Sequence, residues 1–463
     1  MLSCPNSSWD RLPIETLQEI FSQLPIKNLG RCSQVCKQWY LVFNTDYPWR
    51  TFIFKDGIFV RRKFTQHSGW QYHIDHWKLR FLITNAARRW RILIIRPVTN
   101  LFNLYEFFRV LTNFSEYYEK HSPDDKPLAM IRTFHFQWRL HVEEDEVGGI
   151  LHDKDIGTGG EMLHTLTNVV KHLHGLQSIS LIDLQLTAWE AEQFIIELLE
   201  KFSTQLRYLS LLNVTLHAKS FLQIGLFLNL EKLLISPQML QIDSLSLISC
   251  LRHLTTFCII QDEKSVAAPC CNKEAWKQFK AQNCGRTKVW LILKGKPKIP
   301  LIIQPFAPVY GIKMEMSSGQ LTHEVADDIV NFYSETLCQF VQCGLERMKR
   351  GNKMSERADS AIVRIASRCR NLEVLTFREH LSHGTALILG VYSKRNNFKL
   401  IIRKNAMLKR VCWCRRDLRE FDIDFDWLKQ ISKNRDVLIN EIQNLTENSW
   451  TVLEDRMYKS ILT

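Results

Sequence analysis

Apolar residues recur at helical spacing near the start of the chain. The first stripe, at steps of three and four residues, consists of Ile14, Leu17, Phe21 and Leu24. Pro13 suits the first turn of this helix, and Pro25 ends it. A short helix around Leu29 follows, and a third helix has the apolar positions Cys32, Val35, Cys36, Trp39 and Phe43. Three such short helices enclose too little apolar surface to be stable alone, so we expect a partner to complete part of it.

These residues resemble the F-box motif from residue 9 to about residue 50. The matching positions are Leu12, Pro13, Leu17, Ile20, Phe21, Leu24, Pro25, Leu29, Val35, Cys36 and Trp39. The resemblance implies docking on the Skp adaptor, which links F-box proteins to a cullin scaffold and a RING subunit. It also implies that eight residues bind the adaptor or form the F-box core, and the sequence does not divide the two roles among them. These residues are Leu12, Pro13, Ile20, Leu24, Leu29, Val35, Cys36 and Trp39.

A leucine-rich repeat pattern follows in the middle of the chain. Stretches from Leu176, Leu206 and Leu230 fit L-x-x-L-x-L-x-x-N/C-x-L in their apolar positions, and a weaker copy begins at Leu254. Further copies are indicated at 131–136, 372–377 and 408–413. The ninth position, usually Asn or Cys, holds Leu184, Val214 and Gln238. Backbone groups in these loops therefore need other hydrogen-bonding partners.

Each repeat predicts a short strand of a parallel concave sheet, and segments such as 188–202 predict outer helices. Two segments are expected to interrupt the array: an acidic, glycine-rich loop at 143–160, and 262–300, which contains a helix from Lys273 and a strand near Val289–Leu293. The expected fold is α/β, with a three-helix F-box domain at 1–55, an irregular leucine-rich-repeat solenoid at 56–420 and a helical capping segment at 421–463. This combination resembles the F-box only branch of the family.

The outward positions of four predicted strands suggest where a substrate binds. Each of the four strands has three outward positions, and Lys232 is the one charged residue among these twelve. The row Ile182, Leu212, Ser236 and Ile260 is nearly all apolar, and an exposed apolar strip marks a contact surface. The candidate substrate-binding residues are Ile182, Tyr208, Leu212, Leu234 and Ile260. The alternative is that segment 421–463 or a long loop folds back over the strip.

Composition and charge narrow the classes of protein. The chain has 463 residues, of which 45% are hydrophobic, so it is not mainly disordered. No apolar run approaches the ~18 residues of a membrane span, and we expect a soluble protein in the cytoplasm, the nucleus or both. The net charge of +13 is concentrated in 51–100 and 251–300, without a nucleic-acid-binding motif, so nucleic acid is not an expected partner. The cysteines lack paired zinc-ligand spacing, so no metal or cofactor is predicted.

Candidate catalytic groups are weak. His172 and His174 are two residues apart, do not share a helix face and read as a helix-end pair. Asp422, Asp424 and Asp426 alternate with apolar residues, as on a solvated strand edge. The leading hypothesis is therefore a non-catalytic substrate receptor of an SCF (Skp–cullin–F-box) ubiquitin ligase with an unknown protein substrate. The alternatives are an adaptor-binding scaffold without ligase function and a basic nuclear protein associated with nucleic acid.

Overall fold

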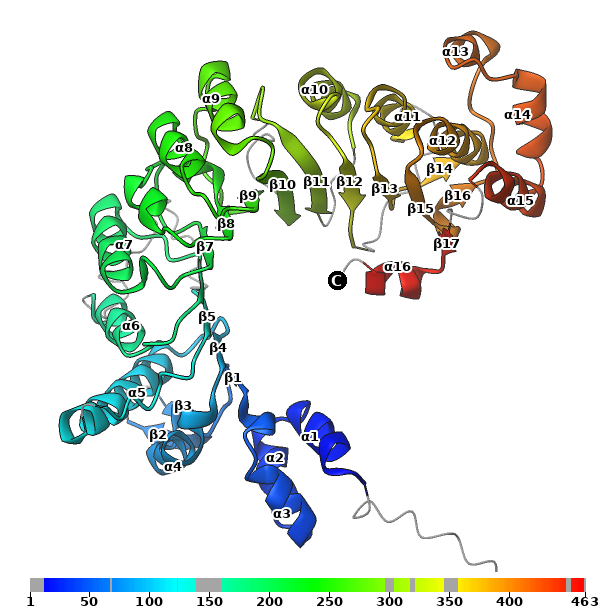
Figure 1. Cartoon of the computed structure of the whole chain (residues 1–463). Coiled ribbons are helices and arrows are strands. Elements are labelled where there is room, and N and C mark those ends of the chain that lie inside the picture. Colours follow the sequence, from blue (N-terminus) through cyan, green and yellow to red (C-terminus); the bar gives the residue numbers. More distant parts are fainter. Residues whose placement is uncertain are drawn as a thin grey trace, which may run out of the picture. The chain divides into compact units, whose positions relative to one another are not determined.

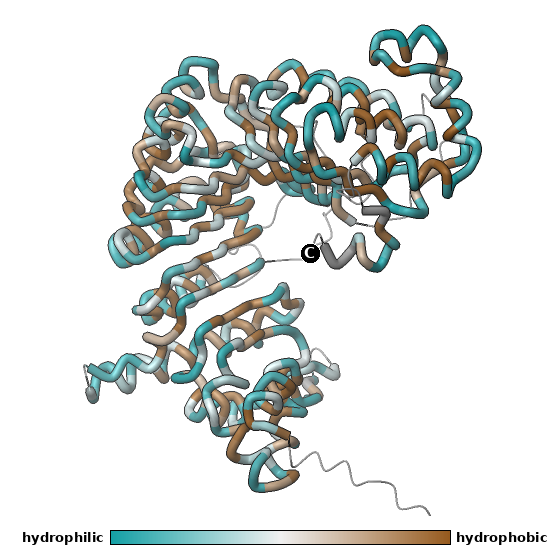
Figure 2. The backbone as a smooth tube through the Cα atoms, turned by 45° about the vertical axis from the view of Figure 1, so that its right-hand side comes forward, coloured by the Kyte–Doolittle hydropathy of each residue, from teal (hydrophilic) through white to brown (hydrophobic). Residues whose placement is uncertain are grey.

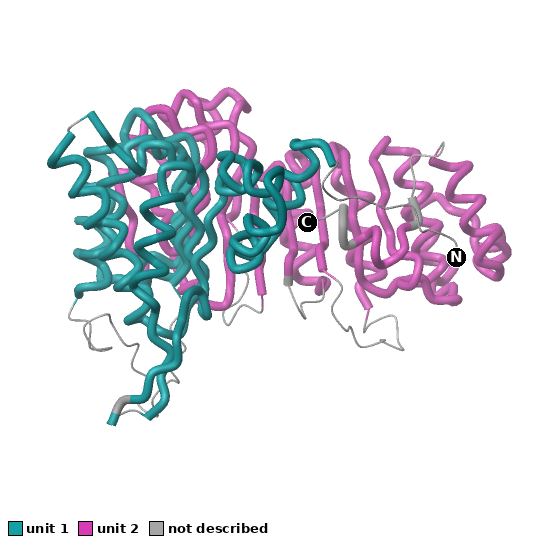
Figure 3. Tube along the Cα trace, turned by 90° about the horizontal axis from the view of Figure 1, so that it is seen from below, with its two compact units in different colours: residues 1–215 teal, residues 216–463 magenta. Residues whose placement is uncertain are grey.

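The computed structural model describes residues 12–66, 69–122, 124–138, 160–295, 304–316, 321–344, 357–446 and 451–461. The chain divides into two compact units, Met1–Thr215 and Leu216–Thr463 (Figure 3). It is an α/β protein in which N-terminal helices precede short parallel strands (Figure 1). Hydrophobic residues follow these strands (Figure 2). Among the described residues, no helix has the length and apolar character needed to cross a membrane.

Unit 1 begins with short helices and continues with parallel strands separated by longer helices. Its helices are α1 (Ile14–Ser22), α2 (Ile26–Cys32), α3 (Lys37–Phe43), η2 (Tyr47–Trp49), α4 (His76–Ala86), η3 (Ala87–Arg89), α5 (Leu101–His121), α6 (Glu161–Lys171) and α7 (Ala188–Phe202). Its parallel strands, in sheet order, are β1 (Thr51–Phe54), β4 (Ile92–Ile95), β5 (Thr133–Gln137), β6 (Ser178–Ile182) and β7 (Tyr208–Leu212). An antiparallel hairpin of β2 (Val60–Thr65) and β3 (Gly69–Ile74) is inserted between β1 and α4.

Unit 2 repeats the strand–helix order. Its parallel strands, in sheet order, are β8 (Lys232–Ile235), β9 (Thr256–Gln261), β10 (Lys288–Gly295), β11 (Val309–Met316), β12 (Gln339–Gln342), β13 (Val374–Phe377), β15 (Lys399–Arg403) and β17 (Thr451–Leu453). Its helices are η4 (Leu222–Leu226), η5 (Pro237–Met239), α8 (Ile242–Ser249), α9 (Lys273–Asn283), α10 (His323–Tyr333), α11 (Asp359–Arg368), α12 (His383–Asn396), η7 (Lys404–Ala406), α13 (Arg415–Glu420), α14 (Phe425–Ile431), α15 (Arg435–Leu445) and α16 (Asp455–Ile461).

The repeat pattern coincides with strands β6 to β9. The leucine-type positions of the first two repeats are buried on the helix-covered side: Leu176, Ile179, Leu181, Leu206, Leu209 and Leu211. Equivalent positions pair across neighbouring strands, as Ile179 does with Leu209 and Leu233 with Phe257. Within each unit, this arrangement is compatible with a leucine-rich-repeat solenoid.

In unit 1, the residues directly before the ninth repeat position make the polar contacts that Asn or Cys usually makes at that position. Asp183 and Asn213 have φ angles of 63° and 49°, a left-handed conformation that Asp and Asn tolerate better than most residues. The Asn213 side-chain amide donates a hydrogen bond of 3.0 Å to Asp183 Oδ1, and Asn213 is fully buried. An Asx pair therefore joins the two loops side by side.

Buried glutamines act similarly in unit 2. The side-chain oxygens of Gln238, Gln304 and Gln342 accept hydrogen bonds from the backbone N–H groups of Val266, Cys271 and Arg378, respectively. The N···O distances are 3.4, 3.1 and 3.2 Å, and the three glutamines are fully buried. Each amide thus satisfies a backbone donor in a neighbouring segment, which is what buried polar groups require.

Two expectations about the array are wrong. Segment 262–295 does not interrupt it, because α9 and β10 follow β9, and β10 pairs in parallel with both β9 and β11. The copy at 408–413 is not a strand of the main sheet, since Met407–Leu408 (β16) pairs with Leu381–Ser382 (β14) instead. Strand β15, which pairs with β13, occupies that place in the sheet, and its apolar residues Leu400, Ile401 and Ile402 are all buried. The expected loop at 143–160 lies, apart from its last residue, outside the described residues.

The segment from residue 421 onward contains helices and one further strand. Helix α15 packs on α12, where Ile442 lies against Gly390, and β17 pairs with β15. Helix α16 lies on the opposite face of the sheet from α10 to α12 (Figure 1). There Tyr458 is buried with Ile401 and Leu453, and its hydroxyl donates to the Gln342 carbonyl oxygen at 2.5 Å. The C-terminal helix therefore covers the outward side of the last strands of unit 2.

Candidate functional site

The three N-terminal helices share a small apolar core. Leu17 and Phe21 from α1, Leu29 from α2 and Val42 from α3 are at most 2% exposed. The ring of Trp39 meets that of Phe21 edge to face, with centroids 5.3 Å apart. These contacts fix the mutual orientation of the helices.

Helix η2 attaches this helical trio to the first strand. Trp49 is buried, its indole N–H donates to the Phe43 carbonyl oxygen at 2.7 Å, and its ring meets the Phe43 ring edge to face. Arg89 places its guanidinium over the Trp49 ring and donates to the carbonyl oxygen of Asn44. The trio is thus anchored to the strand-containing part of unit 1 on one side.

Exposure separates the eight residues that the F-box resemblance grouped together. Leu29 is buried in the trio's core, whereas Leu12, Leu24, Cys36 and Trp39 are half-buried. Pro13, Ile20 and Val35 are exposed, with exposed fractions of 38% for Ile20 and 62% for Val35. Core and surface members of the set are therefore distinct.

The structure exposes three further large apolar residues that are not among these eight. Tyr40 and Leu41 on α3 are 56% and 62% exposed and belong to neither the stripes nor the set of eight, whereas Ile14 on α1, 46% exposed, belongs to the first stripe but not to the set of eight. Tyr40 and Leu41 lie between the core positions Trp39 and Val42, so a search for core periodicity passes over them. A helical trio of this size with so many exposed large apolar side chains has the character of a contact surface.

The expected apolar strip on β6 to β9 is not exposed. Leu212 and Ile260 are 4% and 1% exposed, and Ser236 is fully buried. Ile182, Tyr208 and Leu234 are half-buried. The expectation of an open strip is therefore wrong: every residue of β9 from Phe257 to Gln261 is buried, so strand alternation does not make one face solvent-accessible there. Substrate binding by these residues stays a prediction.

Strands β10 and β11 present a different outward surface. The Trp290 ring lies over Gly311, where a Cβ atom would come within 2.5 Å of the ring. Trp290 and Tyr310 meet edge to face at 5.7 Å, and the Lys288 ammonium lies 4.2 Å from the centre of the Tyr310 ring. Tyr310 donates to a carboxylate oxygen of Glu373 at 2.9 Å. We call Lys288, Trp290 and Tyr310 the β10–β11 aromatic surface.

The β2–β3 hairpin exposes a second group of aromatic residues. Phe64 pairs with Trp70 and Arg62 with Tyr72, so these four side chains share one face of the hairpin. The three aromatic residues are 57–58% exposed. The Arg62 guanidinium lies 4.5 Å from the centre of the Trp70 ring. The other face packs on α5, where His73 meets Phe102.

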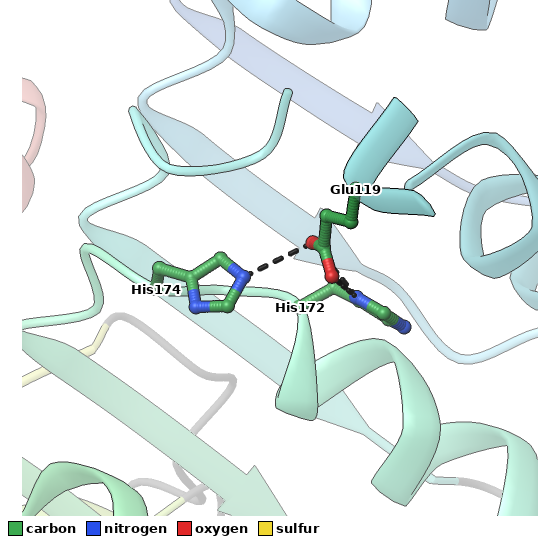
Figure 4. Close-up of side chains that lie close together, drawn as sticks. All are labelled: Glu119, His172 and His174. Atoms are coloured by element: carbon green, nitrogen blue, oxygen red, sulfur yellow. Dashed lines mark hydrogen bonds and ion pairs between the residues drawn. The ribbon is translucent and has the colours of Figure 1, made fainter. Parts of the chain in front are cut away.

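Two histidines that sequence spacing separated converge on one carboxylate (Figure 4). Helix α6 ends at Lys171, so His172 and His174 lie in the connection to β6, and Glu119 comes from the last turn of α5. The Glu119 Oε1 atom is 3.0 Å from His172 Nδ1 and 3.0 Å from His174 Nε2. The helix-end interpretation is correct for position but missed this meeting, since Glu119 is 53 residues from His172 in sequence.

The surroundings shift the pKa values in this cluster. Partial burial is the main cause that lowers the pKa of His174, and the charges of Lys201 and Lys126 act in the same direction. Burial opposes ionisation of Glu119, but its hydrogen bonds to His174 and His172 outweigh that and lower its pKa. At neutral pH, Glu119 is therefore ionised, and His174 favours its neutral form.

The three aspartates at 422, 424 and 426 do not form a strand edge. Asp422 is in a turn with φ of 55°, and Asp424 caps α14 by accepting from the backbone N–H groups of Asp426 and Trp427. Asp426 pairs with Arg415 at 3.1 Å. The strand interpretation is wrong because Asp at a helix N-cap satisfies free backbone donors there.

Comparison with known families identifies the N-terminal helices. No curated protein matches the chain. The family model described as F-box-like matches residues 9–55, which include α1, α2, α3 and η2. The match agrees with the resemblance that the apolar spacing indicates, and it covers the part of the chain that exposes Val35 and Leu41. The chain therefore carries an F-box-like domain at its N-terminal end.

Proposed function

We propose that this protein is a non-catalytic substrate-recognition subunit of an SCF ubiquitin ligase. The F-box-like domain binds the Skp adaptor, and the repeats bind the protein to be ubiquitylated. The observation that carries the proposal is the exposed apolar surface on a domain that matches the F-box-like model. The cullin and RING subunit join through the adaptor.

The adaptor contact is best assigned to the exposed side chains of the domain. Val35, Leu41 and Ile20 are exposed and apolar, so their burial against a partner releases water from apolar surface. Leu29 and Trp39 instead support the helices from inside. Of the eight residues selected from sequence, the exposed members make the direct contact and the buried ones maintain its shape.

Substrate recognition is best supported at the β10–β11 aromatic surface. Aromatic side chains are enriched at the energetic centres of protein interfaces, and Trp and Tyr bring large rigid area at low entropic cost. Trp290 is fixed by Tyr310, and Gly311 provides the room for its ring. In the expected row Leu212, Ser236 and Ile260 are buried, whereas Trp290 and Tyr310 are half-buried and Lys288 is exposed.

A receptor in such a ligase needs no nucleophile. Holding a substrate lysine near a charged ubiquitin carrier raises its effective concentration, which accelerates transfer without new chemistry. This role requires one surface that binds the adaptor and one that binds the substrate. The exposed apolar side chains of the F-box-like domain provide the first, and the β10–β11 aromatic surface provides the second.

Affinity purification of the full chain tests the proposal. Recovery of both adaptor and cullin supports a ligase receptor, whereas adaptor without cullin supports a scaffold. In the double variant Leu12→Ala/Pro13→Ala we expect recovery of both to be lost while the repeats stay folded. Undiminished recovery by a soluble double variant would contradict the F-box assignment.

The β2–β3 hairpin favours one second function, binding of single-stranded nucleic acid. Its exposed face combines Phe64, Trp70 and Tyr72 with Arg62, and such proteins combine aromatic stacking with positive charge. The test is binding of a single-stranded RNA oligonucleotide at two salt concentrations. Nucleic-acid binding is supported if the affinity falls with salt and is lost in Trp70→Ala but not in the exposed control Trp189→Ala. It is excluded if the chain shows no salt-dependent binding.

A further inference from the structure

The strongest unassigned side-chain cluster in the described part of the chain is Glu119, His172 and His174. One possible ligand atom from each lies within 4.8 Å of those from the other two. The three residues are partly buried, with side-chain exposures of 24%, 14% and 25%, respectively. They come from the end of α5 and from the connection that leads from α6 into β6 (Figure 4).

Two imidazole rings and one hydroxyl group converge on the Glu119 carboxylate. Glu119 Oε1 lies 3.1 Å from the Ser115 hydroxyl in addition to the two ring nitrogens at 3.0 Å. His172 Nδ1 is also 3.1 Å from Oε2, so the two carboxylate oxygens, with about four lone-pair directions between them, can accept all three groups. A cation can take the place of the two ring protons, because each deprotonated ring nitrogen then offers a lone pair on the side of the carboxylate.

We propose that Glu119, His172 and His174 form a zinc-binding site. Two imidazoles and one glutamate are a known zinc ligand set, with bonds of about 2.0–2.2 Å and a fourth position open to water. Tetrahedral bonds of that length place ligand atoms about 3.3 Å apart, close to the 3.0 Å between Glu119 Oε1 and each of the two ring nitrogens. All three ligand atoms lie within 4.8 Å of one another, so the two ring nitrogens must close in on each other when they surround one ion.

The supporting residues hold the ligands in place. The outer nitrogen of His172, Nε2, lies 3.8 Å from Glu116 Oε1, which is too long for a hydrogen bond but places a negative charge behind the ring. Leu173 and Leu176 are fully buried on either side of His174, and Arg132 donates to the Gly175 carbonyl oxygen at 3.0 Å. The ligand-bearing loop is therefore fixed by its own packing rather than by the ion.

Two positive charges act against the ion. Lys126 and Lys201 are near enough to lower the pKa of His174, and they repel a cation as well. Glu116 and Glu119 supply opposing negative charge. The bound ion would join the end of α5 to the α6–β6 connection, a role in stabilising unit 1 that is independent of adaptor binding.

Zinc titration of the metal-free full chain against a chromophoric chelator tests the site. We expect Glu119→Gln and His174→Asn each to bind at this site at least tenfold more weakly than wild type. His164→Asn is the matched control, because His164 is an exposed histidine on α6 outside the cluster, bonded to Asn168. The chain's cysteines are the same in every variant, so their background binding cancels in the comparison.

Two further measurements keep the test decisive if a variant folds poorly. Zinc should raise the melting temperature of the wild type and of His164→Asn, since binding to the folded state alone stabilises it. Cobalt bound in place of zinc should show no thiolate charge-transfer absorption. The proposal is overturned if wild type and both site variants bind zinc with equal affinity. It is also overturned if zinc does not raise the melting temperature, or if cobalt binds through thiolates alone. The three residues are then a hydrogen-bonded cluster.

Discussion

At the scale of single residues, Gly384 shows where the backbone leaves no room for a side chain. It lies at the start of α12, and a Cβ atom there would be 2.5 Å from the carbonyl oxygen of Val411. We expect Gly384→Ala to destabilise unit 2 by roughly 1–3 kcal/mol, because backbone must move to relieve the overlap. Urea unfolding measures this. Gly30→Ala is the control, since nothing lies within 4 Å of its Cβ position; equal stability of both variants would contradict the expectation.

Also at the residue scale, Glu379 makes stability depend on pH. Burial is the main cause that raises its pKa above the ordinary 4.5, although Leu321 N–H and Gln342 donate to it. As pH rises, the unfolded chain ionises this residue first, so the unfolding free energy falls. Glu379→Gln should therefore gain stability relative to wild type as the pH rises above the ordinary pKa of 4.5. The exposed Glu335→Gln is the control, and a pH-independent difference for Glu379→Gln would contradict this account.

At the scale of elements, α7 shows what a sequence predicts well. Its bounds, Ala188–Phe202, coincide with the predicted helix because an apolar stripe follows a reciprocal cap. Thr187 accepts from the Glu190 N–H at 3.3 Å, and Glu190 accepts from the Thr187 N–H at 3.0 Å. Thr187→Ala should cost about 1 kcal/mol in urea unfolding, with Gln193→Ala near neutral as the mid-helix control. A loss no larger than the control's would show that the cap contributes nothing.

Elements with polar outward positions were harder to predict. Strand β11 alternates Gly311, Lys313 and Glu315 on its outward side, and its register shifts beside Trp290, so the repeat consensus fails there. The Glu119–His172–His174 cluster was missed for another reason. It joins residues from separate elements, and a single sequence does not reveal which loop ends meet in space. The prediction of an exposed apolar strip was wrong because the alternation of residues shows which side of a strand a residue is on. It does not show what covers that side.

At the scale of the whole molecule, the apolar spacing of the first helices predicted a domain whose match to the F-box-like model is confirmed. It did not divide core from contact surface, because both are apolar and recur at similar intervals. The exposed fraction of each side chain separates the core from the contact surface: Leu29 is buried in the core, and Val35 is on the surface. In the function proposed above, the outward apolar side chains of this domain therefore bind the adaptor.

The most direct measurement is the affinity of purified Skp adaptor for the full chain carrying Val35→Asp. Val35 is 62% exposed, so the variant should fold, while a buried interface anchor is typically worth ~2 kcal/mol or more, about thirtyfold in affinity. The neighbouring Gln34→Asp adds the same charge at an exposed polar position and is the control. We predict at least thirtyfold weaker binding for Val35→Asp and at most a few-fold change for Gln34→Asp. Equal affinity of both variants and wild type would contradict adaptor binding through this surface.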